Sequence, residues 1–455
     1  MQVICNCSVI LTNILYNLPG SEHFNKLFYF INFVRLFHLL LYPIWIKNEY
    51  SGLKLKIGNL LNRKMLPFDK ALKTVLDSAQ LLSSKKVSIT HSLNRVLAED
   101  IKSDIDIPPC DRAVMDGYAC RREDIEKELS IVEVIPAGKN PEKEIVPGQC
   151  AKIMTGAVMP IGADCVIMVE HTENPTDTTV RIFGENTNDF IRYQGEDIST
   201  GQIVLAKGTL IKPQHIAVLA SAGYTEVHVS KQPKVGIIAT GDELVEPHIK
   251  PTLCQLRNSN SLQFKTQLEN IGVAVTYYGI AKDSIDEIDN FFRKAADQCD
   301  IVAVSGGVSM GDFDFVPEIF KKNNIKLLFE KIALKPGKPT VFGTGKELYC
   351  FGIPGNPVST FVVTELLIKP FLYKLMGHEY SPVNIKLPLA ETITRKDTER
   401  LGWFPVRITS EGLLKSIDYH SSAHINSLSN ADGLISMNVG VAELPKGSFV
   451  PIRLI

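Results

Sequence analysis

Residues 301–314 read Ile-Val-Ala-Val-Ser-Gly-Gly-Val-Ser-Met-Gly-Asp-Phe-Asp, an apolar run followed by a glycine-rich segment that ends in carboxylates. The run Ile301–Val304 has the composition of a buried strand. The three glycines and two serines of Ser305–Asp314 allow a nest of backbone amides that can wrap a phosphate or another oxyanion. Asp312 and Asp314 would repel that anion unless a divalent cation bridges them. The segment is also compatible with an ordinary turn, and it matches neither a Walker A loop nor G-x-G-x-x-G.

Strands and helices alternate on both sides of this segment. Short apolar runs typical of buried strands occur at Val235–Ala239, Val273–Gly279 and Ile301–Val304. Helices are expected at Asn258–Ile271, at Ile285–Ala296, near Phe315–Lys321 and from about Pro357 to Met376. This alternation predicts crossover connections and a mostly parallel sheet covered by helices on both faces. Ligands of such sheets bind outside the carboxyl ends of the strands, where the following loops converge.

The remaining segments predict smaller units. We expect a helix from Phe68 to about Leu82, a short helix at Ser92–Ala98, and a helix at Pro213–Ala222 before a strand at Thr225–Val229. Between about residues 110 and 200, a small all-β unit is predicted by the β-branched runs Ser130–Ile135, Cys150–Met154, Cys165–Val169 and Thr179–Phe183. After about Ser381, short strands and turns without a long helix predict a β-barrel-like domain.

The chain of 455 residues is too long for one hydrophobic core, so several domains are expected. The fold class is multidomain α/β plus β. We expect a helical linker region at 65–110 and 200–232, a small β domain at 111–199, a central α/β domain with a mostly parallel sheet at 233–378, and a C-terminal β-barrel-like domain at 379–455.

Residues 1–64 differ in character from the rest of the chain. The stretch Leu27–Ile46 is nearly long enough to cross a bilayer, but Arg35 and Pro43 interrupt it. Met65 opens Met-Leu-Pro-Phe-Asp-Lys-Ala-Leu, which resembles a natural protein start. We therefore interpret residues 1–64 as an upstream extension, with a membrane anchor as the alternative. Without that anchor, a cytoplasmic protein is expected.

The composition excludes some classes of partner. Lys plus Arg (49) nearly equals Asp plus Glu (50), so no global charge favours nucleic acid, and any anion site must be local. The nine cysteines are scattered and form no C-x-x-C pair. Their spacing predicts buried, reduced cysteines in a cytosolic protein rather than a zinc site.

Three loops that follow predicted strands carry chemistry. Beside the segment quoted above, Thr240–Leu244 places Asp242 and Glu243 where a metal or a ribose could meet them, although a helix N-cap is an equal alternative. A third region, Lys331–Pro339, is a compact cationic patch of three lysines around two prolines.

The cationic patch is followed by Ile353–Ser359, a rigid loop whose Pro357 suits the first turn of a helix. Loops of this kind at one sheet edge favour a phosphate-plus-metal site over separate structural roles. No H-E-x-x-H or G-x-S-x-G motif and no evident nucleophile occur in the sequence. The expected chemistry is therefore electrostatic, with Mg²⁺ and lysines stabilising a displaced phosphate.

Seven segments in order resemble those of the molybdopterin molybdenumtransferases, the MoeA and gephyrin E-domain group. They are Asp111–Ala119, Ile153–Gly156, Arg192–Ile198, Thr240–Leu244, Ser305–Asp314, Lys335–Pro339 and Pro354–Ser359. The resemblance covers about residues 65–455 and implies a central domain of the molybdopterin-binding type. It also implies a homodimer whose site combines the α/β domain of one subunit with the Met-Asp-Gly-Tyr-Ala domain of the other.

The family reaction converts adenylylated molybdopterin and molybdate, both substrates, into molybdenum cofactor and AMP, with Mg²⁺. A molybdopterin adenylyltransferase is the implied partner. The resemblance, together with the loops above, assigns catalytic roles to Asp116, Asp197, Asp242, Glu243, Lys331 and Lys335. The expected substrate-binding residues are Thr155, Arg192, Ser305, Gly306, Gly307, Ser309, Lys338, Pro354, Pro357, Ser359, Arg400 and Ser422. The expected metal ligands are Glu196, Asp283 and Asp314.

Some of these assignments have alternatives. Asp116 precedes a glycine, and Asp-Gly is also a favoured turn. The segment that begins at Arg400 lacks the second arginine expected a few residues on. His420 and His424 flank Ser422. They could touch the substrate, although an exposed loop position is the more common role of such histidines.

Two other functions compete with molybdenum insertion. Competence-damage-like amidohydrolases share a similar α/β domain, but resemblance to them leaves the Met-Asp-Gly-Tyr-Ala segment and residues 379–455 unexplained. A non-enzymatic scaffold is the second alternative. A scaffold without activity would have lost its carboxylates and lysines, which are present here.

Overall fold

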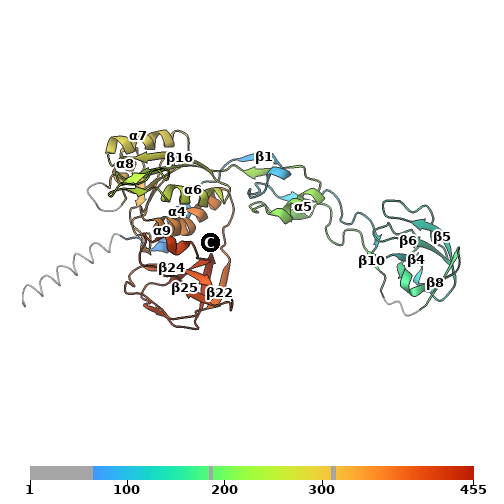
Figure 1. Ribbon diagram of the computed structural model, residues 1–455. Coiled ribbons are helices and arrows are strands. Elements are labelled where there is room, and N and C mark those ends of the chain that lie inside the picture. The colour runs from blue at the N-terminus through green and yellow to red at the C-terminus, as the bar shows by residue number, and fades with distance from the viewer. Residues whose placement is uncertain (1–64, 184–187, 309–313) are drawn as a thin grey trace, which may run out of the picture. The chain divides into compact units, whose positions relative to one another are not determined.

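The computed structural model describes residues 65–183, 188–308 and 314–455 (Figure 1). Six strands form the central sheet in the order β16-β13-β17-β21-β20-β18, and β20 runs against the direction of the other five. The strands are β13 (Lys234–Thr240), β16 (Ala274–Ala281), β17 (Ile301–Ser305), β18 (Lys326–Phe329), β20 (Val341–Thr344) and β21 (Tyr349–Ile353). The prediction of a mostly parallel sheet is confirmed.

Helices cover both faces of this sheet because successive residues of each strand point to opposite sides. One face packs against α6 (Asn260–Glu269), α9 (Pro357–Val363) and α10 (Lys369–Leu375), with a π-helical turn, Thr364–Ile368, between the last two. The other face packs against α7 (Ile285–Ala296) and α8 (Val316–Lys322). Figure 1 shows α7 and α8 on one side of the sheet and α6 and α9 on the other.

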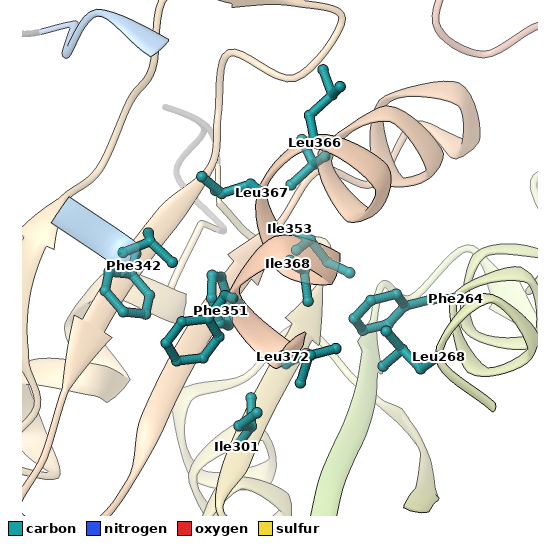
Figure 2. Close-up of a cluster of buried hydrophobic side chains, with 14 of the residues drawn as sticks. Phe264, Leu268, Ile301, Phe342, Phe351, Ile353, Leu366, Leu367, Ile368 and Leu372 are labelled. Atoms are coloured by element: carbon teal, nitrogen blue, oxygen red, sulfur yellow. The ribbon is translucent and has the colours of Figure 1, made fainter. Parts of the chain in front are cut away.

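The larger of the two cores is rich in aromatic and branched side chains. Phe342 and Phe351 lie with ring centroids 4.7 Å apart, and both are fully buried. Figure 2 shows them beside the helical residues Leu367 and Leu372, with Phe264 of α6 on the far side. A core packed this closely holds the strand ends, and hence the loops that follow them, in fixed positions.

The helix α7 illustrates why the sequence folds as it does here. Ser284 caps the helix by accepting a hydrogen bond from the Glu287 amide at 3.3 Å. Ile288, Phe292 and Ala295 recur at helical spacing and are buried against the sheet. The helix therefore has the bounds that its apolar periodicity predicts.

The linker segments contain more β-structure than their sequence indicates. The helix α4 (Phe68–Ser78) ends before Leu82, since Ala79 adopts an extended conformation. The predicted helix at Ser92–Ala98 is wrong, because Val96 and Leu97 instead form β-bridges to Leu210 and Val229 and bury their side chains. The other elements are β1 (Ser84–Ser88) with β12 (Glu226–Ser230), β2 (Ile101–Lys102) with β11 (Ile203–Leu205), and α5 (Pro213–Ser221).

The small β domain contains a six-stranded sheet in the order β7-β4-β6-β5-β9-β8. Its strands are β4 (Gly117–Cys120), β5 (Leu129–Ile135), β6 (Gln149–Ile153), β7 (Cys165–Met168), β8 (Thr172–Thr176) and β9 (Thr179–Ile182). A separate ribbon pairs β3 (Arg112–Ala113) with β10 (Ile191–Arg192). The ribbon carries Arg192, one of the predicted site residues.

The C-terminal domain is a sheet in the order β19-β24-β26-β28-β22, with β25 also paired to β24. Its own strands are β22 (Asn384–Pro388), β24 (Leu401–Ile408), β25 (Leu414–Ser416), β26 (Gly433–Met437) and β28 (Phe449–Leu454), and β23 (Ile393–Thr394) pairs with β27 (Glu443–Leu444). The edge strand β19 (Leu334–Lys335) belongs to the cationic segment and runs parallel to β24. This pairing places Lys335 beside the C-terminal domain.

Two expectations concern the N-terminal stretch and the cysteines. The apolar stretch Leu27–Ile46 lies outside the described residues, and among those that are described no helix is long and apolar enough to span a membrane. Four described cysteines are buried, but Cys254 is exposed and Cys110 and Cys299 are partly exposed. The expectation of buried cysteines is therefore wrong for these three.

Candidate active site

A cleft of about 1020 Å³ opens beyond the carboxyl ends of β13, β17 and β21. The loops after these three strands and the cationic segment line it, together with residues of the C-terminal domain. Of the residues predicted from sequence, the cleft brings together Glu243, Asp283, Ser305, Gly306, Gly307, Asp314, Lys335, Lys338, Pro354, Pro357, Ser359, Arg400 and Ser422. These residues come from seven separate segments of the chain, and the fold makes them neighbours.

The floor of the cleft is backbone that only glycine allows. Gly306 has φ +100°, and a Cβ there would lie 2.7 Å from the carbonyl oxygen of Thr240. The Gly306 amide donates to the Ile353 carbonyl at 3.1 Å, so the loops after β17 and β21 are joined. Ser309 lies outside the described residues.

One wall of the cleft is acidic. Asp242 and Asp283 exchange hydrogen bonds, each amide donating to the other's carboxylate, at 3.3 Å and 3.2 Å. Burial raises the pKa of the Asp283 carboxyl, and three neighbouring carboxylates raise it further. Those neighbours are Glu243, Asp242 and Asp314. The arrangement concentrates negative charge at a point where an added cation would relieve the repulsion.

Another part of the lining, the basic wall, carries cations. Lys335 and Arg400 both donate to Oδ2 of Asp397, at 3.3 Å and 2.5 Å. Burial alone would raise the pKa of Asp397, but hydrogen bonds from Arg400, from the Glu399 amide and from Lys335 lower it to about 2. Lys338, which is exposed, extends this wall. A bound anion would therefore meet the cations on this side.

Hydrogen bonds from neighbouring segments hold the loop after β21 that lines the cleft. Asn356 donates to the Ser422 hydroxyl at 2.8 Å, and the Val358 amide donates to the Ser422 carbonyl at 3.1 Å. Asn260 donates to the Gly355 carbonyl at 2.6 Å. These bonds fix the loop that carries Pro354, Pro357 and Ser359 against the C-terminal domain.

A second group of predicted residues lies in the small β domain and does not line this cleft. Asp116 accepts hydrogen bonds from the amide and the hydroxyl of Thr155, both at 2.7 Å, and these bonds lower the pKa of its carboxyl. Arg192 forms an ion pair with Asp197. Glu196 accepts from the Tyr193 amide at 3.0 Å. All are exposed side chains whose partners in the described chain are local.

Two further predicted residues lie beside the cleft without lining it. Asp242 exchanges hydrogen bonds with Asp283 of the acidic wall. Lys331 lies four residues before Lys335, and its carbonyl accepts from the Leu66 amide at 2.9 Å. Neither residue is among those that line the cleft.

Several lining residues were not identified from the sequence. They are Arg257, Asn258, Asn260 and Tyr419, with Asp397 behind the basic wall. The polar run Arg257-Asn-Ser-Asn260 follows the short strand β15 (Leu256–Arg257) at the start of α6, a position that could have indicated it. His420 also lines the cleft, and its ring stacks on that of His424 with the ring centroids 5.2 Å apart. From the sequence, both histidines were expected as exposed loop residues.

Three family models match this chain in succession. They are the MoeA N-terminal region (domain I and II) at residues 66–223, the probable molybdopterin binding domain at 236–374, and the MoeA C-terminal region (domain IV) at 386–455. The molybdopterin molybdenumtransferase of Staphylococcus aureus (strain Mu50 / ATCC 700699) is 35% identical over 404 residues, covering 86% of this chain and 96% of the relative. This chain belongs to the molybdopterin molybdenumtransferase family.

Other members of the molybdopterin molybdenumtransferase family agree with this placement. The Staphylococcus epidermidis enzyme (strain ATCC 12228 / FDA PCI 1200) is 34% identical over 403 residues, covering 86% of this chain and 96% of its own. The crystal structure of the molybdopterin biosynthesis MoeA protein from Pyrococcus horikoshii OT3 superposes with a TM-score of 0.75 at 31% identity, covering 86% of this chain and 100% of that one. The multidomain α/β plus β fold expected from sequence is thereby confirmed.

Proposed function

We propose that this chain inserts molybdenum from molybdate into molybdopterin, using adenylylated molybdopterin as the second substrate and releasing AMP. The observation that carries the proposal is one cleft with an acidic wall, a basic wall and a glycine backbone floor at the carboxyl ends of parallel strands. In the reaction, water breaks the phosphoanhydride bond. AMP leaves with its own phosphate and the pterin keeps the other, and the water oxygen is added to one of these two phosphates. The two sulfur atoms of the pterin then replace two oxygens of molybdate, which take up protons and leave as water.

The floor and the basic wall suit the anionic parts of these substrates. Molybdate is a tetrahedral dianion, and Lys335, Lys338 and Arg400 supply charged N–H donors on one side of the cleft. Ser359 and Ser422 add hydroxyl groups. The backbone at Gly306 and Gly307 carries no side chain, so a phosphate can approach it closely.

The acidic wall fits a magnesium ion. Carboxylate oxygens are the ligands that Mg²⁺ takes, and the ion keeps several waters and binds substrate phosphates as well. Within residues 65–183, 188–308 and 314–455, no three acidic, histidine or cysteine side chains already converge as a metal site. We assign Asp283 and Asp314 as the ligands from the α/β domain, with Asp242 and Glu243 beside them. A bound ion would neutralise charge as the phosphoanhydride breaks.

The predicted residues of the small β domain enter the proposal through a second subunit. Asp116, Thr155, Arg192, Glu196 and Asp197 are exposed and lie on the domain that carries the Met-Asp-Gly-Tyr-Ala segment. We propose a homodimer in which this group faces the cleft of the other subunit and Glu196 completes the metal site. A molybdopterin adenylyltransferase in the cytoplasm would supply the substrate.

The deciding experiment measures AMP release from adenylylated molybdopterin, with and without molybdate and Mg²⁺. We expect release to require both, to stop when a chelator removes Mg²⁺, and to return when Mg²⁺ is restored. Asp314→Asn should lower the rate at least about tenfold, because a carboxylate that binds the ion is lost. The control, Asp77→Asn, removes a charge from an exposed ion pair on α4. Equal rates for wild type and Asp314→Asn would overturn the site assignment.

A further inference from the structure

Asp397 stands behind the basic wall and does not itself line the cleft. One of its oxygens, Oδ2, accepts hydrogen bonds from two cations that do line it, Lys335 at 3.3 Å and Arg400 at 2.5 Å. The other oxygen, Oδ1, accepts from the Glu399 amide at 3.1 Å. The carboxylate is therefore fixed to the backbone on one side and holds two charged side chains on the other.

The three side chains are shielded enough for these contacts to fix geometry. Exposure is 40% for Lys335, 22% for Arg400 and 28% for Asp397. Pairs on an open surface contribute little because both partners remain mobile and hydrated. Here a carboxylate with a lowered pKa stays ionised at any physiological pH, so both contacts persist.

The backbone of Arg400 is held as well. The guanidinium of Arg395 donates to the Arg400 carbonyl at 2.8 Å and to the Val441 carbonyl at 2.8 Å. On the other side, the Leu401 amide donates to the Ala333 carbonyl at 3.0 Å, where β24 meets β19. Hydrogen bonds thus hold the backbone on both sides of Arg400, so the direction of the two charged groups depends on their side chains.

Those heads repel each other. Two like charges that share one acceptor oxygen lie within a few ångströms, and without a carboxylate between them each would turn toward water. Lysine in particular has a flexible stem, so its ammonium group has no preferred direction of its own. Something must therefore hold Lys335 beside Arg400 before an anion arrives.

We propose that Asp397 is a positioning residue that aligns Lys335 and Arg400 for the tetrahedral oxyanion in the cleft. The inference deepens the proposed function and rests on it, because the anion concerned is molybdate. Asp397 does not contact the substrate and acts only through the two cations. Its carboxylate offsets their repulsion while leaving N–H groups of both free to face the cleft.

Removing the carboxylate has a second, opposite effect, because the wall gains net positive charge. The added positive charge strengthens the long-range attraction of the wall for an anion, but salt screens this attraction at a partly exposed site. The loss of the carboxylate also removes the alignment of Lys335 and Arg400, and charge-assisted hydrogen bonds to an anion depend on the alignment of donor and acceptor. Lys338 keeps the wall positive in either case. We therefore expect the loss of alignment to dominate.

The test titrates the full-length protein with sodium molybdate by calorimetry, and measures AMP release as a function of molybdate. Asp397→Asn should weaken molybdate binding about tenfold and raise KM for molybdate by a similar factor. Asp397→Glu should recover to within about threefold of wild type, because it restores the charge. The rate at saturating molybdate should change less than about threefold, since a structural defect would instead lower the active fraction.

Glu391→Gln is the matched control. It removes a carboxylate of the same domain that accepts from Ser416, away from the cleft, and should leave KM unchanged. If Asp397→Asn does not fold, Asp397→Ser replaces it, because serine can still accept from the Glu399 amide. Wild-type or tighter molybdate binding in the folded uncharged variant overturns the inference. A wild type that binds molybdate but releases no AMP would refute the proposed function and leave the binding test of Asp397 intact.

Discussion

The cleft of the α/β domain and the Asp116 group of the small β domain both contain clustered charged side chains, but these side chains find their hydrogen-bond and ion-pair partners in different ways. In the cleft, Asp283 and Lys335 come from distant segments. Burial and neighbouring carboxylates raise the pKa of Asp283, and Lys335 shares the Asp397 carboxylate with Arg400. In the small β domain, Asp116 and Arg192 bond to residues of their own domain and remain exposed. The difference agrees with the proposal that the cleft is preorganised within one subunit and that the Asp116 group faces the cleft of another.

The largest effect is expected for the basic wall. Lys335→Met should lower the rate of AMP release about 10²–10³-fold, because a preorganised charge that faces the substrate is lost. Lys331→Met should change the rate about threefold or less, since Lys331 does not line the cleft. A large loss in Lys331→Met would instead support the catalytic role that the resemblance assigns to it. Steady-state AMP release measures both.

Mixing variants tests whether the two regions work in one site. Asp116→Asn alone should lower the rate about 10–100-fold, because one charge near the substrate is lost. Co-refolding it with Lys335→Met should restore about a quarter of the wild-type rate, since half of the dimers are mixed and each of these has one intact site. Lys335→Met mixed with Arg400→Met should recover nothing, because both changes affect the same wall. No recovery in the first mixture would contradict a shared site.

The glycine floor should be sensitive to a single methyl group. Gly306→Ala forces a side chain into φ +100° and against Thr240, so the free energy of unfolding should fall by about 1–3 kcal/mol. Gly355→Ala is the control in the neighbouring loop, where a Cβ meets only a Cα atom at 3.8 Å. Its unfolding free energy should stay within about 0.5 kcal/mol of wild type. Urea denaturation followed by circular dichroism compares the three proteins.

The smallest effect concerns acid stability. The folded-state pKa of Asp397 is about 2, below its ordinary value of 3.8, so its contribution is present above about pH 4 and is lost as the pH falls toward 2. This contribution is at most about 2 kcal/mol. Urea denaturation at about pH 6 and about pH 2.5 should show a smaller loss of stability in Asp397→Asn than in wild type. Equal losses would mean that the contacts of Asp397 add no stability.

The parts of the fold that could be predicted from the sequence are those with strong periodicity. The bounds of α7 match their prediction because capping by Ser284 and an apolar stripe act together. The predicted helix at Ser92–Ala98 is wrong because Val96 and Leu97, near its end, form bridges to the distant residues Leu210 and Val229, and a helix this short has little stability of its own. Local pattern does not report such long-range pairing.

The candidate site divides in the same way. Residues in loops after strands, such as Glu243 and Asp314, could be identified because the carboxyl edge of a parallel sheet is a common binding position. Asp397 could not, because its importance lies in bonds to Lys335 and Arg400, and Lys335 is 62 residues away in sequence. The contact between Lys335 and Asp397 arises only when β19 pairs with β24, and the local sequence around either residue gives no sign of this pairing.

That pairing also bears on how the protein is made. During translation the segment that carries Lys335 leaves the ribosome before β24, its strand partner, has been synthesised. Leu66, which bridges to Ile332, is available from the start. A nascent chain that already has all six strands of the central sheet therefore still lacks the strand that pairs with β19 and the Asp397 carboxylate that holds Lys335.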